Sequence, residues 1–400
     1  MSESVRTAVA AGRRPPRGLF DLPPTRRRRQ ERTKAQTQDN RVHNRSLVLA
    51  TLYREGAMSR ADLSRVSSLT APTVSALVAD LEADGLVADV VPRLEGARRQ
   101  GKPSMLVEIQ DDAVNLVVLD LSHGEYFRGA VTNLRGEVVE RSQVAVGDAL
   151  GEAAHDLVNE LVADLLERAP RRVLGIGVGS PGIVDDTGTV RQAAHLEWHD
   201  LPLARRLTDR FGIPAYVGND VNTAALAVLH FRGSEAQNLM VIATEHGVGA
   251  GLVVGGELVA GEQFAAGEIG HLTVDVDVDG EPCVCGRRGC LDPMIDAGHL
   301  RARLAATADS GHDAILADAG QALGTVLAPI ACALNLNEIV LTGPADLIDG
   351  PLLRAAVETV QARTLAPIGA SLTIRSLAGD DDLILLGGAC LVLAAELGVL

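Results

Sequence analysis

Several features that define whole classes of protein are missing from this chain of 400 residues. It contains no run of 18 or more apolar residues, so the sequence offers no segment that would span a membrane. Its first residues are polar and rich in arginine, without the apolar core of a secretory signal. No repeat of 20–50 residues indicates a solenoid. We therefore expect a cytoplasmic protein with two or three globular domains.

Lysine is also scarce, and none follows Lys102, which removes one common phosphate ligand from most of the chain. The net charge of −15 argues against a nucleic-acid partner until its distribution is considered. Residues 1–110 hold 19 Lys and Arg against 12 Asp and Glu, a net charge of +7, whereas the remainder holds 18 against 40, a net charge of −22. One end can therefore meet a polyanion while the rest repels it.

The five cysteines are distributed too unevenly for a disulfide framework. Cys283, Cys285 and Cys290 lie within eight residues, whereas Cys332 and Cys390 stand alone in apolar surroundings. The cluster is typical of a metal site, and the two isolated thiols are typical of core packing.

The residues around the cysteine cluster favour zinc. Gly286 and Gly289 let the backbone fold tightly enough for three thiolates to converge. A histidine would complete a tetrahedral Cys₃His set, which leaves no open position and is therefore structural. His271 is the nearest histidine upstream, and His299 is the other local candidate. A reduced cluster without metal is the alternative.

Residues 1–38 are rich in arginine and proline and cannot bury much apolar surface, so a disordered basic tail is expected. Such a tail would add nonspecific DNA affinity through counterion release. A solvated tail without a role is the alternative.

Residues 39–110 have the pattern of a winged helix-turn-helix domain. One helix ends at Gly56, a short second helix begins with Ser59 as its N-cap, and a third begins near Thr70. Two β runs and a basic loop between them follow, as in a wing. In this motif the start of the later helix enters the major groove. A small helical domain for protein contacts is the alternative.

Short hydroxyl side chains at the start of a recognition helix can reach base edges and phosphates, and a basic wing suits phosphates or a minor groove. Helix-turn-helix readers usually pair on palindromes, so we expect a homodimer or homotetramer on a double-stranded operator. The residues predicted to contact DNA are Ser68, Thr70, Pro72, Thr73 and Ser75 on the helix, with Arg98, Arg99 and Lys102 on the wing.

Residues 111–400 alternate strand and helix patterns, which is typical of α/β layers. Helices are predicted over 151–168, 201–211, 220–231, 297–308, 315–333 and 350–366. Strands are predicted over 114–119, 129–133, 173–179, 214–217, 239–243, 250–254, 338–342 and 371–375.

Three motifs give the chain a resemblance to the ROK family of bacterial repressors and sugar kinases. They are GIGVGSPGIVD over 175–185, GNDVNTAA over 218–225, and GEIGH over 267–271 with the cysteine cluster and Leu291-Asp292. The resemblance implies a winged helix-turn-helix followed by an α/β, two-lobed actin-like ATPase (sugar kinase/ROK) fold, with a sugar in the cleft. The implied lobes are roughly 111–230 and 231–400.

The resemblance also implies the residues of a sugar site. Asn219 and Asp220 match the family's Asn-Asp pair, in which the Asp is the catalytic base of the kinases. Glu268 matches an acidic sugar ligand, and His271 matches the zinc-binding histidine. Asp292 stands where the family usually has a longer Glu. Carboxylates and amides form directional hydrogen bonds to sugar hydroxyls.

Both loops that hold phosphate in the family's kinases are altered here. Residues 120–125 read DLSHGE in place of an Asp-x-Gly-Gly-Thr loop, and residues 245–249 read EHGVG in place of Gly-Thr-Gly-x-Gly. Glu125 and Glu245 put carboxylates where a nucleotide would sit, at a cost on the order of a kcal/mol or more each. The sequence therefore predicts no ATP and no catalytic residue, with Asp220 as a vestigial base.

The sequence thus favours a transcription regulator, a repressor of carbohydrate metabolism genes with a sugar as effector. One alternative is an active sugar kinase that carries a DNA reader. Another is a regulator whose ligand is a phosphosugar or a partner protein.

Overall fold

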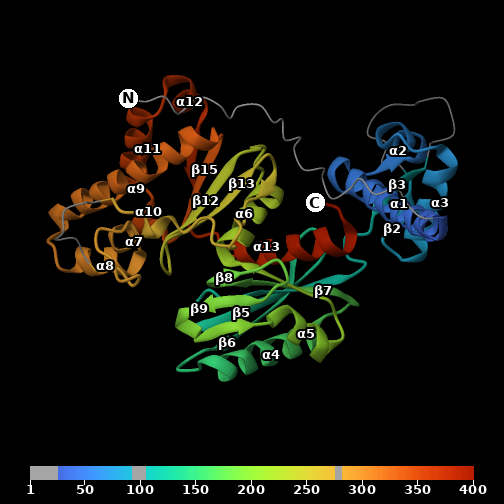
Figure 1. Ribbon diagram of the computed structural model, residues 1–400, viewed down its shortest axis with the longest axis horizontal. Coiled ribbons are helices and arrows are strands. Elements are labelled where there is room, and N and C mark those ends of the chain that lie inside the picture. Colours follow the sequence, from blue (N-terminus) through green and yellow to red (C-terminus); the bar gives the residue numbers. More distant parts are fainter. Residues whose placement is uncertain (1–25, 92–104, 275–281) are drawn as a thin grey trace, which may run out of the picture.

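The computed structural model describes residues 26–91, 105–274 and 282–400. It places a small N-terminal domain beside a larger body of two lobes (Figure 1). The predicted order, a winged helix-turn-helix followed by a two-lobed α/β fold, is confirmed.

The small domain contains three helices and a three-stranded sheet in the order β1-β3-β2. Helix α1 packs against α2 and α3, and the sheet closes the domain as the stem of the wing. The elements are α1 (Arg26–Glu55), β1 (Met58–Ser59), α2 (Arg60–Ser67), α3 (Ala71–Ala83), β2 (Val87–Val90) and β3 (Leu106–Ile109).

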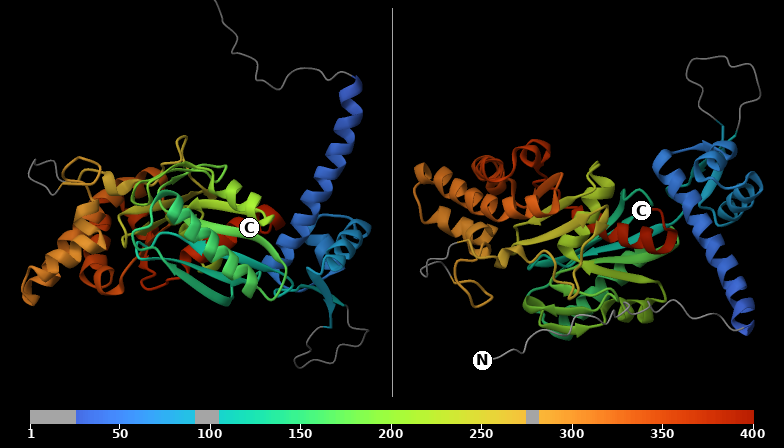
Figure 2. Two further views of the ribbon diagram at one scale, coloured as in Figure 1. Left: turned by 90° about the horizontal axis from the view of Figure 1, so that it is seen from below. Right: turned by 45° about the horizontal axis from the view of Figure 1, so that its top comes forward.

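Helix α1 is longer than the sequence suggested. It begins at Arg26, so the disordered tail predicted over 1–38 is corrected for residues 26–38, while residues 1–25 lie outside the described part. No proline or glycine occurs between Pro24 and Gly56, so nothing in the sequence interrupts the helix. Figure 2 shows α1 extending beyond the rest of its domain.

Side-chain caps define the turn between α2 and α3. Ser59 Oγ accepts from the Asp62 N–H at 3.1 Å and donates to Asp62 Oδ2 at 2.7 Å, which confirms the predicted cap. Thr70 Oγ1 accepts from the Thr73 N–H at 3.4 Å and caps α3. Between the helices Ser68 has a left-handed backbone with φ 57°, which closes the turn.

The first lobe has a five-stranded sheet in the order β11-β7-β4-β5-β6, in which β11, β7 and β4 are parallel. Helix α4 (Gly151–Arg168) packs on β5 and β6, and α5 (Leu203–Phe211) packs on β11. The strands are β4 (Asn115–Asp120), β5 (Tyr126–Thr132), β6 (Val138–Ala145), β7 (Val173–Ser180) and β11 (Ala215–Asn219), with a small separate sheet of β8 (Ile183–Val184), β9 (Val190–Ala193) and β10 (Trp198–Leu201).

The second lobe has a five-stranded sheet in the order β14-β13-β12-β15-β16. Its strands are β12 (Leu239–Ala243), β13 (Gly249–Val254), β14 (Glu257–Leu258), β15 (Glu338–Thr342) and β16 (Thr373–Ser376). Its helices are α7 (Asp292–Ile295), α8 (Ala297–Ala305), α9 (His312–Leu334), α10 (Ala345–Ile348), α11 (Pro351–Arg363) and α12 (Ala366–Ser371).

Within the described ranges, one segment, Asp309–Leu334 around α9, is long and apolar enough to cross a membrane by length and composition. Its burial is that of a core helix, because much of one face packs inside the second lobe. Gly320 and Gly324 bring α9 close to α11, where an added Cβ at Gly320 would lie 2.1 Å from the Leu352 carbonyl oxygen.

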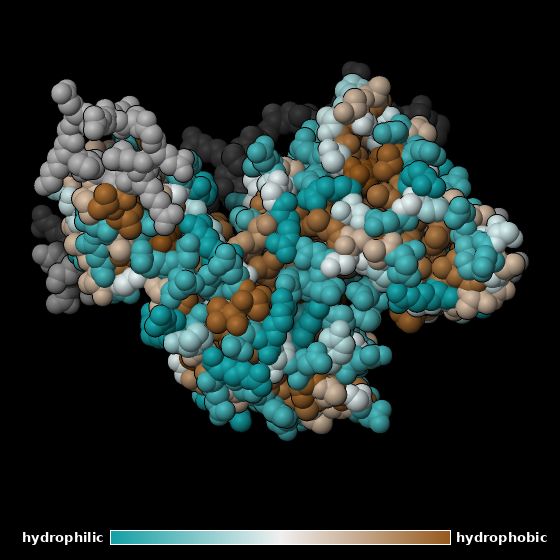
Figure 3. Space-filling model, turned by 180° about the vertical axis from the view of Figure 1, so that it is seen from behind, coloured by the Kyte–Doolittle hydropathy of each residue, from teal (hydrophilic) through white to brown (hydrophobic). Residues whose placement is uncertain are grey.

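From behind, hydrophilic side chains cover most of the visible surface (Figure 3).

Two helices, α6 (Asp220–Phe231) and α13 (Leu383–Val392), lie between the sheets of the two lobes. Glycine allows α13 to approach both α6 and β7 closely. A Cβ at Gly387 would lie 2.0 Å from the Thr223 carbonyl oxygen of α6, and a Cβ at Gly177 of β7 would lie 2.0 Å from the Gly388 carbonyl oxygen. Helix α13 packs against β4, β7 and β11 of the first lobe. The predicted second lobe, 231–400, is therefore corrected at its C-terminal end.

The small N-terminal domain and the body share one hydrophobic core. Leu52 of α1 lies in the same cluster as Ala389 of α13 and Leu393 beyond its end. Tyr53 adds a polar contact, because its hydroxyl donates to the Leu134 carbonyl at 2.8 Å. The two parts are thus joined by packing as well as by the chain.

Removal of a side chain from this shared core should loosen both parts. Leu393 is fully buried, so Leu393→Ala should lower the free energy of unfolding by about 2–5 kcal/mol. Leu365→Ala is the matched control, since Leu365 is 70% exposed and its loss should change stability by less than about 0.5 kcal/mol. Urea unfolding followed by circular dichroism measures both, and equal midpoints for the two variants would contradict the shared core.

Candidate ligand cleft, metal centre and DNA-reading face

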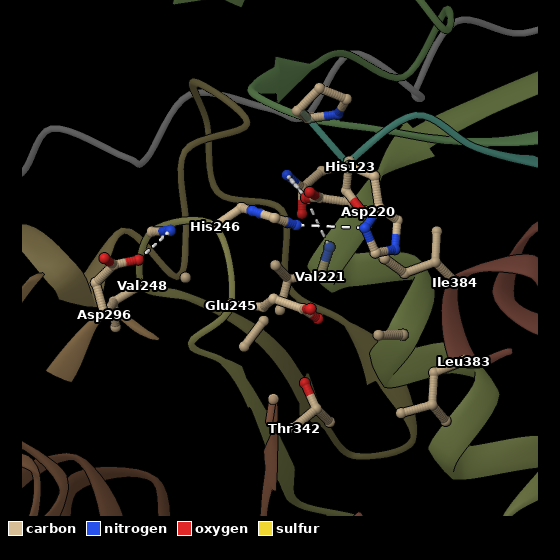
Figure 4. A pocket seen from close by; sticks show the side chains of 18 of the residues that line it. His123, Asp220, Val221, Glu245, His246, Val248, Asp296, Thr342, Leu383 and Ile384 are labelled. Atoms are coloured by element: carbon tan, nitrogen blue, oxygen red, sulfur yellow. Dashed lines mark hydrogen bonds between the residues drawn. The ribbon is translucent and has the colours of Figure 1, made fainter. Parts of the chain in front are cut away.

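A cleft of about 510 Å³ lies between the two lobes and is lined by residues of both (Figure 4). It brings together the four side chains predicted to bind sugar: Asn219, Asp220, Glu268 and Asp292. Asn219 ends the parallel strand β11 and Asp220 follows it, at the carboxyl end of the strand, where ligands usually bind in α/β folds.

Asn219 and Asp220 are held by the start of α6. Asn219 Oδ1 accepts from the Asn222 N–H at 2.9 Å and caps the helix, while its Nδ2 donates to Asp220 Oδ1 at 2.8 Å. Burial raises the pKa of Asp220 to about 7, and the nearby carboxylates of Asp120 and Glu268 act in the same direction. The Asn219 amide is thus fixed, because its Nδ2 also donates to the Gly182 carbonyl at 2.9 Å, and Asp220 offers a carboxyl group that titrates near neutral pH.

Glu268 is positioned by a tight loop against β13. The preceding Gly267 has φ 99°, and a Cβ there would lie 1.8 Å from the Ala250 carbonyl oxygen, so glycine is required. A single turn, Ile269–His271, follows and carries His271 to the cysteine cluster. Glu268 is thus held between a strand and the candidate metal centre.

Asp292 lines the cleft but already has a partner inside the protein. Its Oδ1 accepts from the Val248 N–H at 2.8 Å, and Asp296 Oδ2 accepts from the Gly247 N–H at 2.9 Å. Burial raises the pKa of Asp292. The two aspartates therefore hold the loop before β13, and only part of Asp292 is left for a ligand.

The other altered loop, after β4, is also held by its own side chains. Asp120 is fully buried and accepts from the Ser122 N–H at 2.9 Å. Arg128 donates two further hydrogen bonds to Asp120 Oδ2, at 2.9 and 2.7 Å. Of the two carboxylates predicted to face phosphates, Glu245 lines the cleft, whereas Glu125 is exposed and is not among the residues that line it.

Sequence reasoning missed two histidines in the cleft. His123 and His246 were noted only as replacements in the phosphate loops, yet their rings meet across the cleft with Nδ1 of His123 and Nε2 of His246 3.3 Å apart. The signal was present in the sequence, because an imidazole replaces a small residue in each loop.

The predicted metal ligands His271, Cys283, Cys285 and Cys290 converge, with all four ligand atoms within 4.8 Å of one another. Cys283 Sγ lies 3.4 Å from His271 Nδ1, and Cys285 Sγ lies 3.7 Å from Cys290 Sγ. Tetrahedral zinc, with bonds of about 2.3 Å to sulfur and 2.0–2.1 Å to nitrogen, separates such atom pairs by about 3.6 and 3.8 Å. The donor set and its spacing therefore fit a metal ion such as zinc.

Glycine and arginine shape the cysteine loop. Gly286 and Gly289 have φ values of 84° and 72°, as the predicted tight fold requires. Hydrogen bonds from Arg287 lower the pKa of Cys285 to about 6. His299, the other candidate ligand, lies outside the cluster, and its Nδ1 is 2.9 Å from Asp296 Oδ1.

The predicted DNA-reading helix presents a mostly exposed face. Ser68, Thr70, Pro72 and Ser75 are exposed and Thr73 is half-buried. The predicted wing contacts Arg98, Arg99 and Lys102 lie outside the described residues.

Several arginines of the small domain serve its own packing. Arg41 pairs with Asp80 of α3, and Arg45 pairs with Asp84 at 2.6 Å, which fastens α3 to α1. Arg60 bridges Glu82 and Asp89. The positive charge of the domain is therefore partly neutralised within it.

A winged-helix reader joined to a two-lobed sugar-kinase-like body defines a DNA-binding transcription regulator. The sequence model of the ROK family matches residues 122–395, and that of the MarR family matches residues 43–100. The chain belongs to the ROK family.

Two curated relatives and one solved structure illustrate this membership. A putative xylose repressor of Caldicellulosiruptor sp. (strain Rt8B.4) is 33% identical over 276 residues, which cover 67% of either chain. A glucokinase of Halalkalibacterium halodurans is 30% identical over 315 residues, 68% of this chain and 93% of that one. The crystal structure of a ROK family transcriptional regulator, a homologue of the E. coli MLC protein, superposes with a TM-score of 0.78 at 22% identity, over 90% of this chain and 97% of that one.

The raised pKa of Asp220 gives a prediction for stability against pH. An Asp has a pKa near 4 when unfolded, so the buried carboxyl destabilises the fold as pH rises through about 4 to 7 and it ionises. The urea midpoint of Asp220→Asn relative to the unsubstituted protein should therefore increase between pH 5 and pH 8. The control is Asp209→Asn at an exposed site, for which no such trend is expected. A pH-independent difference for Asp220→Asn would contradict the raised pKa.

Proposed function

We propose that this protein is a cytoplasmic repressor of carbohydrate-metabolism genes whose effector, a sugar, binds in the cleft between the lobes. The observation that carries the proposal is the convergence of Asn219, Asp220 and Glu268 in one cleft. Two carboxyl groups and an amide suit the hydroxyl groups of a sugar. The repressors among its relatives support the same assignment.

The charge of the cleft favours a neutral sugar over a phosphosugar. Among the cleft-lining residues that the structure describes, Arg128 is the only arginine or lysine, and it is bound to Asp120. Asp220, Glu245 and Glu268 line the same space. An anionic ligand would meet net repulsion there, whereas hydroxyl groups can donate to each carboxylate.

The loops around the cleft argue against phosphoryl transfer. A phosphate-binding loop offers its backbone N–H groups to the nucleotide. Here the N–H groups of Gly247 and Val248 are bound to Asp296 and Asp292, and that of Ser122 is bound to Asp120. An active sugar kinase that carries a DNA reader is the second candidate, favoured by the similarity to a glucokinase; tight binding of Mg-ATP would support it.

Zinc is proposed to hold the loop that positions Glu268. His271, Cys283, Cys285 and Cys290 would complete its tetrahedron, so the ion would have no open position and no part in chemistry. The loss of zinc would free His271 and with it the turn that begins at Glu268.

Helix α13 is proposed to couple the cleft to DNA. Leu383 and Ile384 at its start line the cleft, and Ala389 and Leu393 pack in the core shared with α1. A sugar that favours one arrangement of the lobes would then shift the reader and alter the spacing of two readers in a homodimer or homotetramer. Ser68, Thr70, Pro72, Thr73 and Ser75, with the wing residues Arg98, Arg99 and Lys102, are the proposed DNA contacts.

The zinc proposal predicts a stoichiometry. Cys285 is exposed, so Cys285→Ser should leave packing intact and still remove a ligand. This variant should retain one equivalent of zinc per chain fewer than the unsubstituted protein, measured by mass spectrometry of dialysed protein. Cys332→Ser, outside the cluster, is the control and should retain the full amount. Equal zinc in both variants would remove the basis for this centre.

The effector proposal is tested on the DNA upstream of the protein's own gene. We expect fluorescence anisotropy to show salt-sensitive, sequence-selective binding that one member of a sugar panel releases. Glu268→Gln should retain DNA affinity but weaken the response to that sugar by roughly 10- to 100-fold, the value of a hydrogen bond to a charged group. The exposed Glu262→Gln is the control and should respond normally. Equal DNA affinity with and without every sugar would overturn the effector proposal.

A further inference from the structure

Three side chains that can bind a metal ion meet in the cleft, and they form a group separate from the cysteine cluster. His123 comes from the loop after β4 in the first lobe, and Glu245 and His246 come from the loop after β12 in the second. Their ligand atoms all lie within 4.8 Å of one another (Figure 4). Residues 122 positions apart in the chain are thus brought together where the two lobes face each other.

We propose that His123, Glu245 and His246 form a divalent transition-metal site that joins the two lobes across the cleft. Two imidazoles and a carboxylate are a set that suits Zn²⁺, Co²⁺, Ni²⁺ or Cu²⁺. With three protein ligands, the site leaves a position open to water or to a ligand in the cleft.

The separation of the two imidazole nitrogens supports this site. His123 Nδ1 and His246 Nε2 are 3.3 Å apart. Two nitrogens bound tetrahedrally at about 2.0–2.1 Å from one metal ion would be separated by about 3.3 Å. The rings therefore need little movement to accept the ion. A hydrogen bond between two neutral imidazoles has a similar length and is the competing explanation.

The orientation of His123 is fixed by its surroundings. Its ring stacks on Tyr126 with centroids 4.8 Å apart and an interplanar angle of 15°, and it meets the His246 ring edge-on at 75°. Its other nitrogen, Nε2, lies 3.9 Å from Asp120 Oδ2. At that distance no hydrogen bond joins the two groups, so the stacking on Tyr126 is what orients the ring.

The charge around the site also favours a cation. Glu245 supplies a carboxylate directly, and the buried Asp120 lies behind His123. Arg128 donates two hydrogen bonds to Asp120 and offsets its charge, so the carboxylate of Glu245 is the group that favours a cation. A metal ion would bind the closed lobes more tightly than open ones, because only closure brings both histidines together, and it would therefore favour closure.

The test counts metal ions on the full-length protein. After saturation with Zn²⁺ and dialysis against metal-free buffer, the unsubstituted protein should retain one equivalent more than either His123→Ala or His246→Ala. The control is His199→Ala, which removes an exposed histidine of β10 and should retain the full amount. The difference between variants is independent of the ions held by the cysteine cluster, so this test and that of the structural zinc fail separately.

A second measurement covers variants that fold poorly. Addition of Zn²⁺ to protein purified without added metal should raise the midpoint of thermal unfolding of His199→Ala by more than that of His246→Ala. Equal zinc content in His199→Ala and His246→Ala, together with equal thermal shifts, would overturn the proposal and leave the two imidazoles as a hydrogen-bonded pair.

Discussion

The structure depends on the packing of α13 between the two lobes. Gly387 leaves no room for a side chain against the Thr223 carbonyl, so the helix is pressed onto α6. The same helix begins beside the cleft with Leu383 and ends in the hydrophobic core that contains Leu52 of the DNA reader. Close-packed interiors transmit displacement instead of absorbing it. Under the proposed function, a ligand that moves α13 would act on the DNA-binding domain through this packed helix.

The small N-terminal domain and the body also differ in net charge. Among the described residues, seven acidic side chains line the cleft, and one of them, Asp220, carries a pKa raised to about 7 by its burial and its acidic neighbours. In the DNA-binding domain, Arg41 and Arg60 form salt bridges with carboxylates of the same domain. The proposed sugar site and the predicted DNA contacts therefore lie in parts of the chain that carry opposite net charge.

The sequence predicts several elements at the bounds that the structure shows. Helix α6 and strand β12 were predicted at their observed bounds, and Ser59 caps α2 as expected. It fails at α13, which is apolar all round because both lobes cover it, so no amphipathic period exists. The sequence predicted that Asp292 binds a ligand but not that it accepts a hydrogen bond from the Val248 N–H. That bond depends on the fold, which the spacing of residues in the sequence does not reveal.

The two loops that differ from the phosphate loops of the family's kinases are each held by hydrogen bonds within this protein. A glycine-rich loop that cradles phosphate leaves backbone N–H groups that need an anion. In this protein side-chain carboxylates supply that anion, since Asp292 accepts from Val248 and Asp120 accepts from Ser122. Because those donors are satisfied internally, each loop keeps its shape without a nucleotide. The side chains that such loops then present to the cleft, His123 and His246 among them, are free to serve another ligand.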